Sequence, residues 1–403
     1  MPRNSHPDDL PQLTPDEIRR YGRHLVLEDV GVEGQRRLKA ARVLLIGAGG
    51  LGSPAGLYLA AAGVGTLGLV DFDHVEETNL QRQVLYGQGD LDRPKVEVAA
   101  ARLRATNPHI EIVEHGEELR ADNVRDLFEG YDLIVDGSDN FSTRYLVNDA
   151  CVLLGKPLVW GAVLRFEGQA AVFGLPDGPC YRCLFPEPPP PGLVPSCAEG
   201  GVLGVLPGII GSIQANEAIK WILHRGDLLV GRFLFFDALS SRFREMRLPR
   251  DPSCPTCGDD AKIELKDMEA LCAKPGRDAT VEPSGEEIST DIPDEIPMEI
   301  TVEDLEAWRK GGVEHRLLDV REPTEWQICR IEGAELQPLR GLPRALQEIE
   351  LAKDDLVVVH CHVGGRSAQA VHYLRSQGYV RATNLAGGIE AWSLRIDPTV
   401  PRY

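Results

Sequence analysis

Residues 42–52 read Arg-Val-Leu-Leu-Ile-Gly-Ala-Gly-Gly-Leu-Gly, and this stretch decides the fold of the first part of the chain. Its apolar residues 43–46 predict a buried strand, and the glycines after them fit the spacing Gly-x-Gly-x-x-Gly. We expect an Ala- and Leu-rich helix over residues 53–62 and then a second strand ending at Asp71. Such a strand–helix–strand unit is typical of nucleotide-binding folds, because the glycines let the backbone approach a phosphate and the acid binds ribose hydroxyls.

Length and composition limit the remaining possibilities. A chain of 403 residues predicts two or three domains, and a hydrophobic content of 43% is enough to build their cores. No apolar run approaches the roughly 20 residues of a membrane-spanning helix, and residues 1–13 do not resemble a signal peptide. We therefore expect a cytoplasmic protein with no membrane partner. A net charge of −19 argues against general nucleic-acid binding.

Basic residues after Asp71 favour ATP over NAD as the nucleotide. Arg82 follows the glycine turn, and Lys95 is expected in the first turn of a helix over residues 96–105. A cation there opposes the helix dipole, so a bound polyphosphate nearby would stabilise it.

A later strand, residues 132–135, runs into Asp139 and Asn140. Ligands bind beyond the carboxyl ends of strands in open parallel sheets, so Asp139 can meet the glycine turn and Asp71 in one crevice. A carboxylate close to phosphates is a natural Mg²⁺ ligand. A turn residue or helix cap is the alternative interpretation.

Four of the nine cysteines form two Cys-x-x-Cys pairs separated by 70 residues. Four thiolates in this pattern predict a closed, structural Zn²⁺ site, whereas two redox motifs are the alternative. The four ligands would be Cys180, Cys183, Cys254 and Cys257.

Between the two pairs, a proline-rich stretch precedes Cys197. Its position beside Gly200 and Gly201 favours an accessible, reactive thiol, although lone cysteines more often pack inside a core. Residues 281–300 hold seven acids, no base and three prolines. We therefore predict a first domain over residues 1–260, a flexible acidic linker over 261–297 and a second domain over 298–403.

The second domain contains a strand, residues 355–360, that leads into Cys361, a glycine-rich loop, Arg366 and a helix over residues 368–377. Loop amides and the helix dipole are expected to lower the pKa of the thiol and to stabilise negative charge on what it carries. Four residues separate Cys361 from Arg366, a short loop that fits a persulfide sulfur better than a phosphate. The alternative is a buried packing cysteine.

Two resemblances follow from these motifs. Residues 15–258 resemble the adenylyltransferases that activate ubiquitin-like proteins for molybdopterin synthase and thiamine biosynthesis, and residues 298–403 resemble a rhodanese domain. The first is carried by Arg20-Tyr21-x-Arg23, the glycine turn, Asp71-Phe-Asp73, Asn79-Leu-Gln-Arg82-Gln83, Pro94-Lys95, Asp139-Asn140, both cysteine pairs and Cys197. The second is carried by Asp319-Val-Arg321-Glu322, the Cys361 loop and residues 384–392. One departure is Arg330-Ile-Glu-Gly333, where such rhodanese domains often have His-Ile-Pro-Gly.

The resemblance implies an α/β fold: a Rossmann-like mixed sheet with a structural zinc, followed by a small α/β rhodanese domain. It implies that ATP adenylates the C-terminal glycine of a ubiquitin-like sulfur carrier ending in Gly-Gly, and that a persulfide on Cys361 converts it to a thiocarboxylate. A cysteine desulfurase or another sulfur donor would load Cys361, and Cys197 would form a thioester or resolve an acyl disulfide.

The resemblance also assigns roles to individual residues and implies a homodimer. Gly50 would cradle phosphate, Asp71 would hold the ribose, Asp139 would position Mg²⁺, Asn140 would lie beside the nucleotide, and Arg23 would reach into the neighbouring subunit's site. Three further residues would neutralise developing charge: Asn79, Arg82 and Lys95. The destination of the sulfur stays open among molybdopterin, thiamine, cysteine synthesis and tRNA thiolation.

Two other functions compete with this interpretation. An NAD-dependent oxidoreductase accounts for the glycines and Asp71 but leaves Arg82, Lys95 and the cysteines unused. A scaffold that binds nucleotide and carrier without turnover fits less well, because Cys361 and Arg366 are both intact.

Overall fold

The computed structural model describes residues 9–188, 200–267, 296–349 and 351–403. They divide into two compact units, with residues 9–188 and 200–267 in the first and residues 296–349 and 351–403 in the second. Cys197 and most of the expected linker lie outside the described residues. The domain boundaries given above therefore remain predictions.

The first unit is built on an eight-stranded mixed sheet with the order β3-β2-β1-β4-β5-β6-β7-β8. Neighbouring strands are parallel from β3 to β5 and antiparallel from β5 to β8. This confirms the predicted Rossmann-like mixed sheet. The strands are β1 Arg42–Ile46, β2 Thr66–Val70, β3 Glu111–His115, β4 Leu133–Asp136, β5 Leu158–Leu164, β6 Glu167–Phe173, β7 Arg232–Asp237 and β8 Arg242–Arg247.

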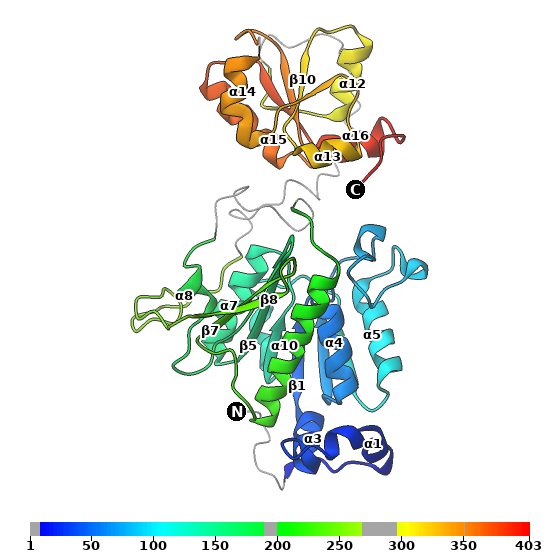
Figure 1. Cartoon of the computed structure of the whole chain (residues 1–403), viewed down its shortest axis with the longest axis vertical. Coiled ribbons are helices and arrows are strands. Elements are labelled where there is room, and N and C mark those ends of the chain that lie inside the picture. The colour runs from blue at the N-terminus through cyan, green and yellow to red at the C-terminus, as the bar shows by residue number, and fades with distance from the viewer. Residues whose placement is uncertain (1–8, 189–199, 268–295, 350) are drawn as a thin grey trace. The chain divides into compact units, whose positions relative to one another are not determined.

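Helices cover both faces of this sheet, because side chains along a strand alternate between its faces. Val43 and Leu45 of β1 join one core cluster with residues of α3, α4, α5 and α10, whereas Leu44 and Ile46 join another with residues of α6 and α7 (Figure 1). The helices are α1 Pro15–Arg20, α2 Gly22–Leu25, α3 Gly31–Ala40, α4 Gly52–Ala62, α5 Lys95–Thr106, α6 Val124–Glu129, α7 Phe141–Leu154, α8 Tyr181–Leu184 and α10 Val205–Leu223.

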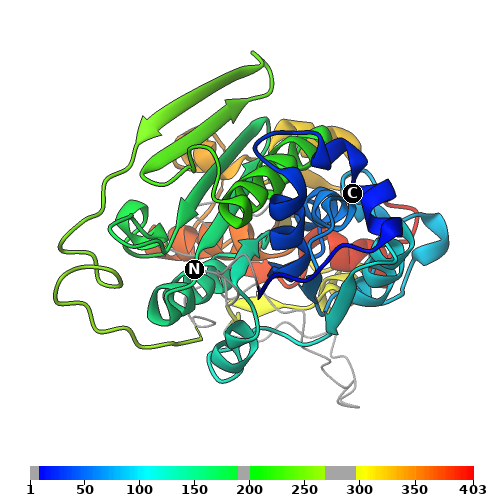
Figure 2. The same ribbon diagram turned by 90° about the horizontal axis from the view of Figure 1, so that it is seen from below.

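The antiparallel end of the sheet is open to solvent. Within the described part of the chain β8 pairs only with β7, at the end of the sheet (Figure 2). All six residues of β8 are exposed. Among the helices of the described ranges, none combines the length and apolarity that crossing a membrane requires.

The second unit is a five-stranded sheet with the order β11-β10-β12-β13-β9, in which every pairing is parallel. Core residues of α12 and α16 cover one face, and those of α14 and α15 cover the other (Figure 1). The strands are β9 Glu299–Ile300, β10 Arg316–Asp319, β11 Ala334–Leu336, β12 Val357–His360 and β13 Ala382–Leu385. The helices are α12 Val302–Lys310, α13 Pro323–Ile328, α14 Leu342–Glu348, α15 Gly365–Ser376 and α16 Gly388–Arg395.

Three helices begin earlier than the sequence predicted, at Gly52, Lys95 and Gly365. In α4 and α15 the first turn reaches back into the glycine-rich loop before it. The free amides at the start of each helix therefore lie beside that loop, which is the arrangement that an anion site requires.

Candidate active sites

The turn between β1 and α4 is too tight for side chains at two of its glycines. Gly47 has a φ of 84°, a left-handed conformation that favours glycine. A Cβ atom added at Gly52 would lie 1.9 Å from the carbonyl oxygen of Gly47. The glycines thus bring the start of α4 directly onto the end of β1, where its amides can face a phosphate.

Asp71, which directly follows β2, is fixed against this turn by two backbone amides. Its Oδ2 accepts a hydrogen bond from Ala48 N at 2.8 Å, and its Oδ1 accepts one from Asp73 N at 2.9 Å. Burial raises the pKa of Asp71, and the Lys95 charge and the two amides offset only part of that rise. Each carboxylate oxygen can accept a second hydrogen bond, so Asp71 keeps acceptors for ribose hydroxyls.

Lys95 is buried at the start of α5, and its Nζ lies 3.1 Å from Asp73 Oδ2. The sequence predicted a bound anion beside this cation, but the chain itself supplies a carboxylate partner. Asp73 is thus a site residue that the sequence argument missed. The sequence feature that could have identified it is its position two residues after Asp71, because residues two apart in an extended chain point to the same side.

The segment 79–83 lies against the glycine turn. A Cβ added at Gly49 would stand 3.5 Å from Gln83 Nε2, and one added at Gly50 would stand 3.8 Å from Arg82 Cγ. Arg82 donates from Nη1 to the carbonyl of Thr78 at 2.9 Å, and Asn79 is buried. Arg82 and Gln83 therefore lie beside the glycine turn, and a role for Asn79 stays a prediction.

The loop after β4 closes the same site from the other side. A Cβ added at Gly47 would lie 3.1 Å from the carbonyl oxygen of Gly137, two residues before the exposed Asp139. Asn140 is the N-cap of α7, where its Oδ1 accepts from Thr143 N at 2.8 Å. The strand ends converge as expected. Asn140 has a capping role in addition to any contact with nucleotide.

Arg23 does not join this site within one chain. It is exposed on α2, two residues after Tyr21, whose ring packs against Gly63 just beyond the end of α4. The eleven residues of α4 span about 16 Å from the glycine turn to that end. A role for Arg23 in a neighbouring subunit stays a prediction.

The four predicted zinc ligands form one cluster. The sulfur atoms of Cys180, Cys183, Cys254 and Cys257 all lie within 4.8 Å of one another, the nearest pairs at 3.3 and 3.5 Å. Sulfurs around a tetrahedral Zn²⁺ are about 3.8 Å apart, so the cluster fits this ion. Hydrogen bonds from the Cys180 thiol and from two backbone amides lower the pKa of Cys183 below its ordinary value.

Asp149 of α7 binds a residue in each of the two cysteine pairs. It binds Arg182 through two carboxylate oxygens, at 2.9 and 2.7 Å, and accepts from Thr256 Oγ1 at 3.0 Å. Arg182 and Thr256 lie within the two Cys-x-x-Cys motifs, so the cluster is joined to the core of the first unit.

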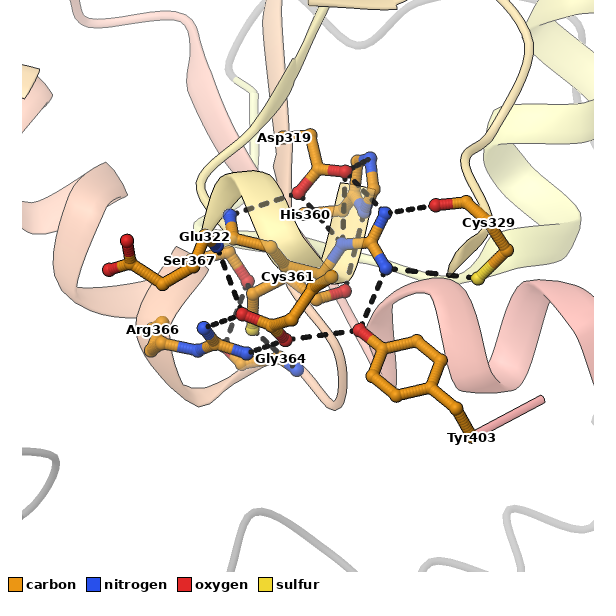
Figure 3. Close-up of polar contacts among 11 residues, drawn as sticks. Asp319, Glu322, Cys329, His360, Cys361, Gly364, Arg366, Ser367 and Tyr403 are labelled. Carbon is orange, nitrogen blue, oxygen red and sulfur yellow. Dashed lines mark hydrogen bonds and ion pairs between the residues drawn. The ribbon is translucent and has the colours of Figure 1, made fainter. Parts of the chain in front are cut away.

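In the second unit, Cys361 directly follows β12 and is fully buried. Its Sγ accepts a hydrogen bond from Gly364 N at 3.1 Å and lies 3.3 Å from Ser367 Oγ (Figure 3). Gly364 has a φ of 101°, so the loop folds back over the sulfur. The loop thus places one backbone amide and one hydroxyl against the sulfur at the start of α15.

Arg366 is held by a residue that the sequence argument did not single out. Its Nη1 and Nη2 lie 2.6 and 2.7 Å from the two carboxylate oxygens of Glu325. Glu325 belongs to α13, 41 positions earlier in the chain, so no local pattern links it to Arg366.

Comparisons with known proteins match both units of the chain. The sequence matches the ThiF family over residues 21–256 and the rhodanese-like domain over residues 301–395. The chain belongs to the ThiF family. It is 48% identical over 395 residues to the probable adenylyltransferase/sulfurtransferase MoeZ of Mycobacterium tuberculosis, covering 97% of this chain and 96% of that protein. It is 41% identical to the adenylyltransferase and sulfurtransferase MOCS3 of Aedes aegypti, covering 97% and 90%.

A solved structure shares the fold. The crystal structure of Escherichia coli MccB with ATP has a TM-score of 0.53 and 23% identity, covering 60% of this chain and 75% of that one. The two family matches and the nearly full-length relatives identify this chain as an adenylyltransferase and sulfurtransferase.

The glycine turn gives a direct test of the first site. Gly52→Ala should destabilise the first unit by about 1–3 kcal/mol or more, because the new methyl group overlaps the Gly47 carbonyl. The matched control is Gly208→Ala in α10, where a Cβ meets nothing within 4 Å and helix propensity improves. Urea unfolding of both variants measures the difference. Equal stability of the two variants would contradict the close contact.

Proposed function

We propose that this enzyme uses ATP to adenylate the C-terminal glycine of a ubiquitin-like sulfur carrier, and then transfers sulfur from a persulfide on Cys361 to give the carrier thiocarboxylate. The observation that carries the proposal is the convergence of the glycine turn, Asp71, Lys95 and the 137–139 loop at one edge of a sheet. The same chain carries a thiol in an anion cradle.

In the first step, the carrier carboxylate attacks the α-phosphorus of ATP, and pyrophosphate leaves. Amides of the glycine turn, including Gly50, cradle the phosphates, and Asp71 binds the ribose. Arg82, Lys95 and Asn79 neutralise the charge that develops on the leaving group. The exposed carboxylate of Asp139 would hold Mg²⁺, which supplies further neutralisation of the phosphates.

In the second step, the terminal sulfur of the Cys361 persulfide attacks the acyl carbon of the carrier adenylate. A carbon–sulfur bond forms, the bond to the AMP oxygen breaks, and AMP leaves with the electron pair. A second thiolate then attacks Sγ of Cys361, so that the bond between Sγ and the outer sulfur breaks, the carrier thiocarboxylate leaves with the electron pair, and a protein disulfide remains for a cellular dithiol to reduce. Cys197 is the candidate for this thiol, or alternatively for an acyl acceptor that forms a thioester.

The proposal includes three partners of this chemistry. A cysteine desulfurase or another persulfide donor loads Cys361. A second copy of the chain forms a homodimer and supplies Arg23, whose exposure and distance from its own glycine turn support this role. The carrier ends in Gly-Gly, and the reaction takes place in the cytoplasm.

Adenylation is tested by ATP–pyrophosphate exchange with each small Gly-Gly-ending protein of the same genome. Exchange should depend on one such carrier and fall about 100-fold or more in Asp139→Ala, because a group that stabilises charge in the transition state is lost. Asp29→Ala, which removes an exposed carboxylate between α2 and α3, is the control and should leave exchange unchanged. Folded protein that shows no exchange with any carrier would instead favour a scaffold that binds without turnover.

The metal proposal has its own test. Purified enzyme should contain about one zinc ion per chain, and Cys180→Ser should lose it together with stability of the first unit. Elemental analysis measures the zinc, and thermal unfolding measures the stability. Cys151→Ser is the control, because this buried cysteine lies outside the cluster. Unchanged zinc content in Cys180→Ser would contradict the four-thiolate site.

A further inference from the structure

We propose that Tyr403 is a positioning residue for sulfur transfer. Its ring holds His362, the neighbour of Cys361, and its hydroxyl fixes the Glu325–Arg366 pair at the other end of the cysteine loop. This inference rests on the proposed function, in which Cys361 carries the sulfur. It adds a residue that lies far from the cysteine loop in sequence and that none of the motifs above includes.

The aromatic contact is the first observation. The rings of Tyr403 and His362 are stacked, with centroids 4.5 Å apart and planes inclined by 10°. His362 lies between Cys361 and the fold of the loop at Gly364, and its carbonyl accepts from Glu390 N at 3.1 Å. Arg402 binds Glu390 through Nε at 2.8 Å and Nη2 at 2.6 Å. Tyr403 and Arg402 are therefore connected to the cysteine loop in two ways, Tyr403 through His362 and Arg402 through Glu390.

The hydroxyl contact is the second observation, and its direction is fixed by chemistry. Arg321 Nη1 lies 2.8 Å from the Tyr403 oxygen, which lies 3.0 Å from Glu325 Oε1 (Figure 3). An arginine can only donate, so the tyrosine oxygen accepts from Arg321 and donates its proton to Glu325. Arg321 is fully buried and paired with Asp319, its Nη2 2.6 Å from Oδ2, which makes it a fixed donor.

Glu325 is the point where this chain of hydrogen bonds reaches the cysteine loop. Its carboxylate accepts from Tyr403, from both terminal nitrogens of Arg366 and from Glu322 N at 2.9 Å. Burial would raise the pKa of Glu325, but these hydrogen bonds and the Arg366 charge lower it overall, so the group stays ionised. Because the Glu325 carboxylate accepts two parallel hydrogen bonds from the Arg366 guanidinium, it fixes the plane of that guanidinium.

The consequence is that Tyr403 orients Arg366 without touching the sulfur. Without the hydroxyl, Glu325 loses its hydrogen-bonded link to the buried Arg321, so the orientation of the Glu325–Arg366 pair is less strictly fixed. An anionic sulfur donor that needs the guanidinium in one orientation should then bind less well. Without the ring, His362 also loses its stacking partner and keeps its contacts with Glu390, its Nε2 3.7 Å from Oε2 and its carbonyl accepting from the Glu390 amide.

The test uses the full chain with thiosulfate as the anionic donor and cyanide as the acceptor. Tyr403→Phe keeps the ring and removes the hydroxyl, so we expect KM for thiosulfate to rise about 3–10-fold while kcat changes less than about twofold. Tyr403→Leu removes both contacts and should lower kcat as well. Tyr403→Phe should therefore keep the kcat that Tyr403→Leu loses, while KM is raised in both variants. The matched control is Tyr373→Phe in α15, whose hydroxyl has no hydrogen-bond partner among the described residues.

Cys361→Ala separates this inference from the function on which it rests. Sulfur transfer that persists in Cys361→Ala would overturn the proposed function. If Cys361→Ala abolishes transfer while both Tyr403 variants match the parent enzyme in KM and kcat, the positioning role is wrong. The positioning role would also be wrong if Tyr403→Phe and Tyr403→Leu lowered kcat and the melting temperature to the same extent, because such a result reports only loss of structure.

Discussion

The contact between Gly52 and the carbonyl of Gly47 is the constraint on which the first unit depends. No atom larger than hydrogen fits on Gly52, so α4 starts directly at the end of β1. The amide of Ala48 inside this turn then holds Asp71 after the neighbouring strand, and Gly47 lets the Gly137 loop approach from β4. One steric requirement thus brings groups from three parallel strands to one edge of the sheet.

In the second unit, two ion pairs lie close to the Cys361 loop. Asp319 and Glu325 balance Arg321 and Arg366, so the four ionised side chains carry no net charge. Buried ions need such partners, because an unpaired charge in a core is very costly. The Glu325–Arg366 pair places one of these balanced charges in the loop that follows Cys361. The groups that contact the Cys361 sulfur itself are the Gly364 amide and the Ser367 hydroxyl at the start of α15.

The sequence predicted features that local patterns encode. Three motifs depend on residues close together in the sequence: the glycine spacing, the Cys-x-x-Cys pairs and the loop after Cys361. The structure contains the tight turn, the cysteine cluster and the folded-back loop that these motifs predict. The sequence could not predict partners from distant segments. Asp73 pairs with Lys95 from 22 residues before it, Glu325 binds Arg366 from 41 residues before it, and Tyr403 binds Glu325 from 78 residues after it. Such pairs depend on tertiary packing, which leaves no periodic signal in the sequence.

The central claim is that one chain couples adenylation to sulfur transfer. It is tested most directly by a single turnover of enzyme that carries radioactive sulfur on Cys361, mixed with the carrier and ATP. The account predicts that label passes to the carrier only when ATP is present, and in an amount equal to the AMP released. Label that reaches the carrier without ATP, or AMP that forms in full while the label stays on the enzyme, would contradict it.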